Sequence, residues 1–220
     1  MFRLVRPFYG SADVFCLFIA HRRQSATNLL EVQSGNLFVK VFRYVGTHIG
    51  QSLDSDVDIQ KRIDKASQGF GALRKHTFSN KDLKPETKAR LYVALVLGIL
   101  LYGCETWFLR EEEFKKLKRF HNDCVRTMLR VNLNQQWRRK IRMTQLFDDL
   151  ENRVRPLRWH YETRLLRWAG HIARMKETRL PKMLLLSWVP NERPIGCPRM
   201  TYGRVVKKAL KRNPEIWPTL

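Results

Sequence analysis

Acidic residues whose spacing could support metal-assisted chemistry are few. Asp148 and Asp149 are adjacent, and Asp13 lies in an Ala-Asp-Val sequence near the N-terminus. Two-metal sites need several carboxylates that converge on ions about 3.5 to 4 Å apart. Neighbouring helical residues point about 100° apart, so Asp148 and Asp149 are expected to be a solvated pair near a helix end. The sequence therefore predicts no catalytic residue.

The cysteines are too scattered to form a metal site by themselves. They are Cys16, Cys104, Cys124 and Cys197, and no two share the short spacing with which zinc sites gather thiolates. His121 lies three residues before Cys124 on a predicted helix and could share an ion with it, but no second ligand pair is suitably placed. A packed pair at the edge of the core is the favoured interpretation. We therefore expect reduced thiols, no metal, no cofactor, and an intracellular protein of the nucleus or cytoplasm.

Positive charge is the strongest functional signal in the sequence. The 42 lysine and arginine residues against 20 aspartate and glutamate residues leave a net charge of +22, with an isoelectric point near 10.5. Residues 131–220 are the more basic part, with 20 basic against 7 acidic residues. A membrane surface or an acidic protein would also attract such a chain, but a phosphate backbone is the favoured partner. The longest apolar run, 91–102, is too short for a membrane span, so no membrane association is expected.

The residue pattern predicts a mainly α fold. It would be a helical bundle with a small N-terminal β element and an irregular, Pro-rich, basic C-terminal arm. Residues 1–36 show no sustained period, whereas 37–53 are rich in β-branched and aromatic residues and are predicted to form a hairpin. Three helices are predicted within 54–130. The second, from Pro85 to Tyr102, is apolar nearly all round, as at the centre of a bundle, so Leu95 is expected to be buried.

The third of these helices, from Glu111 to Arg130, has an apolar stripe opposite a cationic face. Its predicted core residues are Phe114, Leu117, His121, Cys124, Val125 and Met128. Residues 131–220 are predicted to be a basic helical region, with a break around 132–136, a loop at Trp137, and helices at 143–150 and 152–176. Past Pro181 the prolines predict an extended arm, and a short basic helix is expected over 203–212.

Three sequence blocks carry a resemblance to a known family. They are Phe42-Arg43-Tyr44-Val45-Gly46, the segment from Arg90-Leu91-Tyr92 through Leu101-Tyr102-Gly103-Cys104-Glu105-Thr106-Trp107, and Leu166 to Met175 (LRWAGHIARM). Phe120 to Arg126 and Arg179 to Lys182 agree with the same pattern. In order and spacing these blocks resemble the region that follows the catalytic palm in non-LTR (LINE-type) retrotransposon endonuclease/reverse transcriptases, over about residues 37–210.

The resemblance implies a fold and a function for each region. It implies that 37–53 corresponds to the strand pair of the primer grip, 54–130 to a thumb-like helical bundle, and 131–220 to the basic linker beyond it. The family's catalytic signature, a hydrophobic residue followed by Ala-Asp-Asp, is absent from the sequence, and Ala12-Asp13-Val14 lacks the second carboxylate. An RNA-directed DNA polymerase activity, with its Mg²⁺, is therefore expected only if a palm is joined elsewhere.

We expect the chain to bind RNA or an RNA/DNA hybrid through phosphates. The candidate contacts are Lys115, Lys118, Arg119, Arg126, Arg138, Arg139, Lys140, Arg164, Arg167 and Arg174. Arg153, Arg155 and Arg158 are expected on the same basic helix face as the last three. Trp137, beside three cations, is the best candidate among the tryptophans for stacking on a base. The alternatives are an active polymerase completed by a palm elsewhere, and an inert or structural remnant that folds without binding nucleic acid. The sequence does not define an oligomeric state.

Overall fold

The computed structural model describes residues 33–34, 37–38, 41–50, 55–107, 109–186 and 202–219. It confirms the predicted mainly α fold. The chain divides into two compact units, one formed by Ser55–Leu165 and the other by Met1–Asp54 together with Leu166–Leu220. No helix in the described part of the chain is long and apolar enough to cross a membrane.

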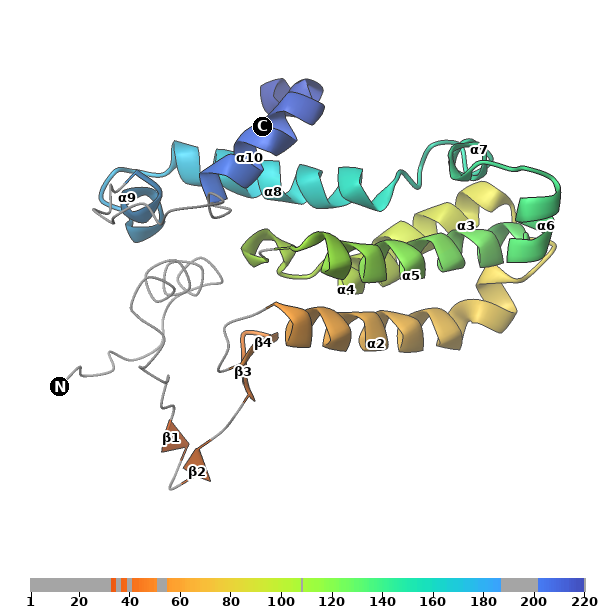
Figure 1. The fold of residues 1–220 in the computed structure, drawn as a ribbon, viewed down its shortest axis with the longest axis horizontal. Coiled ribbons are helices and arrows are strands. Elements are labelled where there is room, and N and C mark those ends of the chain that lie inside the picture. The colour runs from red at the N-terminus through yellow and green to blue at the C-terminus, as the bar shows by residue number, and fades with distance from the viewer. Residues whose placement is uncertain are drawn as a thin grey trace. The chain divides into compact units, whose positions relative to one another are not determined.

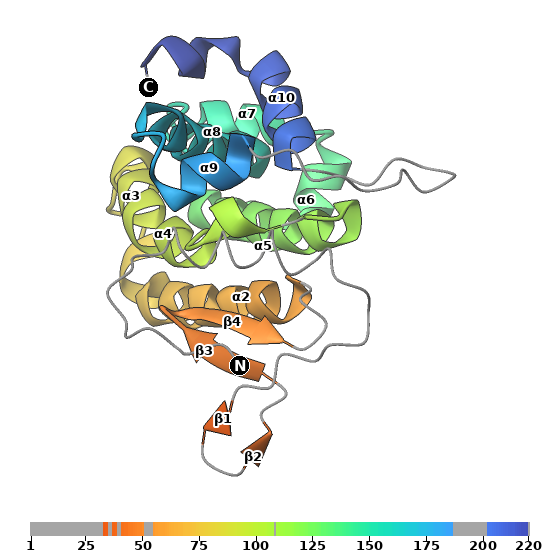
Figure 2. The ribbon, with the colours of Figure 1, turned by 90° about the vertical axis from the view of Figure 1, so that its left-hand side faces the viewer.

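Two antiparallel strand pairs form the β part of the chain. Strand β1 (Gln33–Ser34) pairs with β2 (Leu37–Phe38), and β3 (Val41–Tyr44) pairs with β4 (Thr47–Gly50), as Figure 2 shows for the longer pair. Val45 and Gly46 connect β3 to β4 with φ angles of 45° and 84°, the positive values that a two-residue hairpin turn requires. The hairpin expected within 37–53 is therefore present.

The unit 55–165 is a helical bundle. Its elements are α2 (Asp56–Leu73), the π-helical turn η1 (Arg74–Phe78), α3 (Pro85–Leu91), the π-helical turn η2 (Tyr92–Val96), α4 (Leu97–Leu100), the 3₁₀ turn η3 (Cys104–Thr106), α5 (Glu111–Leu129), α6 (Leu133–Arg138), α7 (Met143–Asp148) and the first half of α8 (Leu157–Arg174). Helix α2 packs against α4 and α5, and α3 packs against α5 (Figures 1 and 2). The three helices expected within 54–130 are thus found, the second of them in three pieces.

Aromatic side chains join α2 to the segment that follows it. The rings of Phe70 and Phe78 stack with centroids 4.5 Å apart, and Tyr92 meets both edge-on at 6.4 Å. Phe78 and Tyr92 are fully buried, as are Leu100 and Leu117 on the neighbouring helices. Burial of these large side chains supplies the main driving force for closing the bundle.

The middle and the end of the predicted second helix are more exposed than expected. Leu95 is 46% exposed and Tyr102 is 45% exposed, so the prediction that the run from Pro85 to Tyr102 is buried all round is wrong. The π-helical turn at Tyr92–Val96 interrupts the α-helical period, and the segment rests on α2 and α5 with one side only. Gly103 ends the segment at φ 71°, as predicted.

Two further boundaries were predicted wrongly. The expected break at 132–136 and the loop at Trp137 are helix α6, which Asn132 caps by accepting a hydrogen bond from the Gln135 N–H at 2.7 Å. The helix expected from residue 152 begins only at Leu157, because Asn152 has a φ of 55° and Pro156 lacks the N–H that an α-helix needs in its interior.

The C-terminal part of the chain contains α9 (Leu180–Leu186), α10 (Tyr202–Arg212) and the 3₁₀ turn η4 (Pro214–Thr219). Lys182 Nζ donates hydrogen bonds to the Ala173 and Met175 carbonyl oxygens at 3.1 and 2.9 Å, and so caps the C-terminal end of α8. Helix α9 contradicts the extended arm predicted directly after Pro181, a residue that suits the first turn of a helix. The helix expected at 203–212 is α10, and the rest of the predicted arm, 187–201, lies outside the described residues.

Candidate nucleic-acid interface

Helix α5 presents a cationic face opposite its buried stripe. Lys115, Lys118 and Arg119 are exposed, and their spacing of three and four residues places them on one side of the helix. None of the three has a hydrogen-bond or ion-pair partner among the described residues. The predicted core stripe of α5, from Phe114 to Met128, is buried as expected. The outward face is therefore the one that α5 offers to a partner.

A second cationic surface follows at α6 and the turn to α7. Arg138, Arg139, Lys140 and Arg142 are all exposed, and no acidic residue occurs between positions 131 and 147. Their side chains have no partner within the described part of the chain. Arg142 was missed as a candidate contact, although the long acid-free stretch was a signal for it. Unpaired cations without nearby carboxylates are free to contact phosphates.

Trp137 stands within this second surface. Its side chain is 85% exposed, and a hollow beside it is lined by Leu133, Gln136, Trp137, Arg138, Lys140 and Ile141. The hollow thus combines an aromatic ring, aliphatic side chains and two cations.

The other tryptophans considered for base stacking are placed differently. Trp107 is buried and donates a hydrogen bond to Asp58 Oδ2 at 3.0 Å. Trp159 is half-buried beneath the guanidinium of Arg155, which lies 4.4 Å from its ring centroid. Trp168 is half-buried, and Trp188 lies outside the described residues. Of the tryptophans whose side chains the structure describes, Trp137 is the one that is largely exposed.

Several other cations are held by partners within the protein. Arg126, one of the candidate contacts, pairs with Asp123 and donates to Gln136 Oε1 at 3.3 Å, and its side chain is only 13% exposed. Lys116 pairs with Asp56 at 2.8 Å, and Arg158 pairs with Glu111 at 3.1 Å. These side chains would have to give up a carboxylate before they could contact a phosphate.

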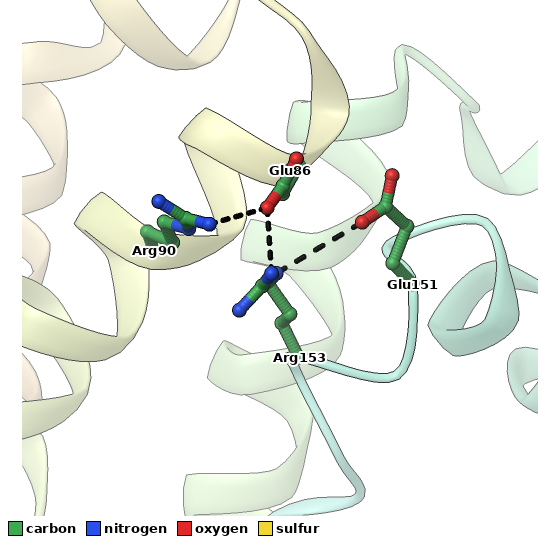
Figure 3. Close-up of polar contacts among 4 residues, drawn as sticks. All are labelled: Glu86, Arg90, Glu151 and Arg153. Atoms are coloured by element: carbon green, nitrogen blue, oxygen red, sulfur yellow. Dashed lines mark hydrogen bonds and ion pairs between the residues drawn. The ribbon is translucent and has the colours of Figure 1, made fainter.

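Arg153 belongs to a small ionic cluster (Figure 3). Oε1 of Glu86 lies 2.6 Å from Nη2 of both Arg90 and Arg153, while Glu151 Oε2 lies 3.9 Å from Arg153 Nε. The charge of Arg90, followed by that of Arg153, lowers the pKa of Glu86, so this carboxylate stays ionised. The cluster links the loop before α8 to α3. Arg153 and Arg155 precede α8, so the prediction that they lie on the basic face of this helix is wrong.

The three candidate arginines of α8 have different surroundings. Arg164 is half-buried, and its Nη1 donates to the Leu101 carbonyl oxygen at 3.0 Å. Arg167 is exposed, and no partner of its side chain is found in the described part of the chain. Arg174 is exposed, and it interacts with another residue of the protein. Arg164 belongs to the unit 55–165, and Arg167 and Arg174 belong to the second unit.

His121 and Cys124 are both buried in the core. His121 Nε2 faces the Arg155 carbonyl oxygen at 3.1 Å, and Nδ1 faces the Tyr92 hydroxyl at 2.8 Å. Because a carbonyl can only accept, Nε2 donates and Nδ1 accepts, which leaves no free lone pair for a metal. Burial raises the pKa of the Cys124 thiol to about 12. Among the described residues, no group of three cysteine, histidine or acidic side chains is placed to hold an ion.

The chain is similar to a transposon-derived protein. A Caenorhabditis elegans protein described as an uncharacterized transposon-derived protein is 27% identical to this chain over 152 residues, which cover 69% of the chain and 53% of that protein. The chain therefore spans about half the length of this relative. The similarity indicates a transposon-related origin. No protein-family model matches the sequence, and no solved structure matches it.

Proposed function

We propose that the chain binds nucleic acid through its phosphates, using the outward face of α5 and the surface around α6. The observation that carries this proposal is the set of exposed cations on these two surfaces that have no partner among the described residues. They are Lys115, Lys118, Arg119, Arg138, Arg139, Lys140 and Arg142. A net charge of +22 would draw the chain to any polyanion, but these side chains provide defined contact points.

We further propose that the chain derives from a non-LTR reverse transcriptase, as the region that follows the palm. The five sequence blocks that resemble this family support the proposal, and the similarity to a transposon-derived protein agrees with it. RNA or an RNA/DNA hybrid is then the proposed partner. On this proposal the chain has no polymerase activity by itself, and Mg²⁺-dependent synthesis would need a palm supplied elsewhere.

The test compares two triple variants that lose the same charge. The first is Lys118→Gln/Arg119→Gln/Arg139→Gln, which removes unpaired cations. The matched control is Lys116→Gln/Arg153→Gln/Arg158→Gln, which removes cations that already pair with carboxylates. Affinity for labelled RNA is measured by fluorescence anisotropy at several salt concentrations, with circular dichroism to confirm folding. Each lost phosphate contact should reduce the slope of log K against log salt by about 0.7 for a single strand and 0.9 for duplex DNA.

In the first variant we expect the slope of log K against log salt to shrink by about two to three. In the control variant we expect it to shrink by less than about one. Equal losses in the two variants would mean that binding follows net charge alone, which contradicts a defined interface. Absence of salt-dependent binding in the unmodified chain would favour the alternative, a structural remnant that folds without a nucleic-acid partner.

A further inference from the structure

We propose that Trp137 is a stacking platform for an unpaired base of a single-stranded nucleic acid, with Arg138 and Lys140 holding the adjacent phosphates. This inference rests on the proposed function and specifies the ligand of one part of the surface. It needs three properties of the site: an accessible ring, an ordered backbone that carries the ring, and surroundings that select a polyanion.

Trp137 is accessible and has no role in the core. Its side chain is 85% exposed, and helix α6 contains no buried residue at all. Leu133, one turn earlier, is 63% exposed and lines the same hollow. Two large apolar side chains on a six-residue helix are thus presented to solvent, which the packing of the bundle does not explain.

The backbone that carries Trp137 is held in place from both ends. Asn132 caps the start of α6 through the Gln135 N–H, and Gln135 Oε1 accepts the Asn132 N–H at 3.1 Å. At the other end, the Ile141 N–H donates to the Gln136 carbonyl at 3.0 Å, and Gln136 Nε2 donates to the Ile141 carbonyl at 3.2 Å. A backbone that is already ordered loses no further freedom when a base stacks on the side chain it carries.

Arg126 of α5 extends this support. Its Nη1 donates to Gln136 Oε1 at 3.3 Å, so the residue before Trp137 is bonded to both α5 and the turn beyond α6. Arg126 is therefore a positioning residue for the platform, whereas the sequence predicts it to be a phosphate contact. Its side chain is largely covered, as this role requires.

The surroundings of the hollow favour a nucleic acid over other occupants. Arg138 and Lys140 line the hollow together with Trp137, and Arg139 and Arg142 are exposed close by in sequence. No acid lies between residues 131 and 147 to neutralise them. An acidic peptide would satisfy the cations but has no flat π face for the indole ring. A base in a duplex is already stacked on its neighbours, so the ligand that uses both features is a single strand.

The experiment measures binding of three nucleic-acid probes and one polypeptide probe to the full chain and to Trp137→Ala. The nucleic-acid probes are a single-stranded RNA of about 12 nucleotides, an abasic strand with the same number of phosphates, and an RNA duplex. Loss of one stacked base should weaken binding of the single strand about five- to hundredfold. The abasic strand and the duplex should be affected less than about twofold, and the salt slope should not change, because the phosphate contacts remain. Trp137→Phe should restore most of the affinity for the single strand.

Each outcome distinguishes this inference from the proposed function. If no probe binds in a salt-dependent way, the proposed function itself is wrong. A second outcome is that the affinity for every probe depends on salt as in the unmodified chain, but Trp137→Ala weakens binding of the abasic and base-containing strands equally. This outcome would support the phosphate interface and refute the stacking site. A poly-glutamate chain serves as the fourth probe. If its binding falls as much as that of RNA in Trp137→Ala, the surface accepts acidic polymers in general, and the inference is overturned.

Discussion

His121 sits at the centre of the bundle and connects three segments of the chain. It bonds to the Tyr92 hydroxyl on one side and to the Arg155 carbonyl on the other, while the Arg155 N–H donates to His160 Nε2 at 3.2 Å. Burial is the main cause that lowers the pKa of His121 to about 3 and that of His160 to about 4. The positive charges of Arg164 and Arg155 lower the latter further. Both rings are therefore neutral in the folded protein at physiological pH.

These two histidines should make the fold sensitive to mild acid. A histidine in the unfolded chain titrates near pH 6.5, so the unfolded chain takes up protons first as the pH falls. Their contribution is fully present above pH 6.5 and is lost progressively towards pH 3 to 4. With about 1.4 kcal/mol per pH unit for each shifted group, the free energy of unfolding should drop by about 2 to 4 kcal/mol between pH 6.5 and 5. Urea denaturation at a series of pH values measures this.

The control for this prediction separates core from surface histidines. His121→Gln should reduce the dependence of the unfolding free energy on pH between 7 and 5. His171→Gln, which changes an exposed ring, should leave it as in the unmodified chain. An identical pH dependence in all three proteins would show that the buried histidines do not govern acid sensitivity.

Helices with a strong apolar period were predictable from sequence, and their ends were less so. The acids Glu111 to Glu113 and the stripe from Phe114 to Met128 located α5 to within one residue at each end. Sequence pattern identified these elements because a 3.6-residue period and the helix dipole act locally.

Three helix ends carry residues other than glycine in left-handed conformations. Arg130, Lys140 and Glu151 have φ angles of 58°, 51° and 54° and follow α5, α6 and α7. In each case the next N–H reaches back five residues, from Val131, Ile141 and Asn152 to the carbonyls of Arg126, Gln136 and Phe147. Glycine usually marks such an end, and none is present here, so residue type does not signal the stops after α6 and α7. For the same reason, the rigid turn that positions Trp137 was predicted only as a loop.

The interrupted segment from α3 to α4 should tolerate substitution on one side only. Leu100 is fully buried, and Leu95 is 46% exposed. Leu100→Ala should lower the free energy of unfolding by about 2 to 5 kcal/mol, because it leaves a cavity in a packed site. Leu95→Ala should lower it by about 1 kcal/mol or less. Urea denaturation of the two variants at one pH gives both values. Comparable losses would mean that Leu95 is covered in solution by something other than the described residues.

Charge at the scale of the whole chain links stability to binding. The unpaired cations of the proposed interface lie on a chain whose net charge is +22, and the described ion pairs neutralise only some of its cations. Like charges repel in the folded state more strongly than in the expanded unfolded chain, because folding brings them closer together. The cations that attract phosphate should therefore also weaken the fold.

Salt should thus act in opposite directions on folding and on binding. Raising sodium chloride from about 50 to about 500 mM shortens the Debye length from above 10 Å to about 4 Å, which screens the repulsion between exposed cations. The thermal midpoint should rise over this range, while the affinity for RNA falls. In Lys118→Gln/Arg119→Gln/Arg139→Gln the net charge decreases from +22 to +19, so both responses to salt should be smaller than in the unmodified chain. Circular dichroism melts and anisotropy titrations in the same buffers measure the two responses. A thermal midpoint that falls as salt is added would show that ion pairs such as those of Glu86 contribute more to stability than the repulsion removes, and that the cationic surface does not weaken the fold.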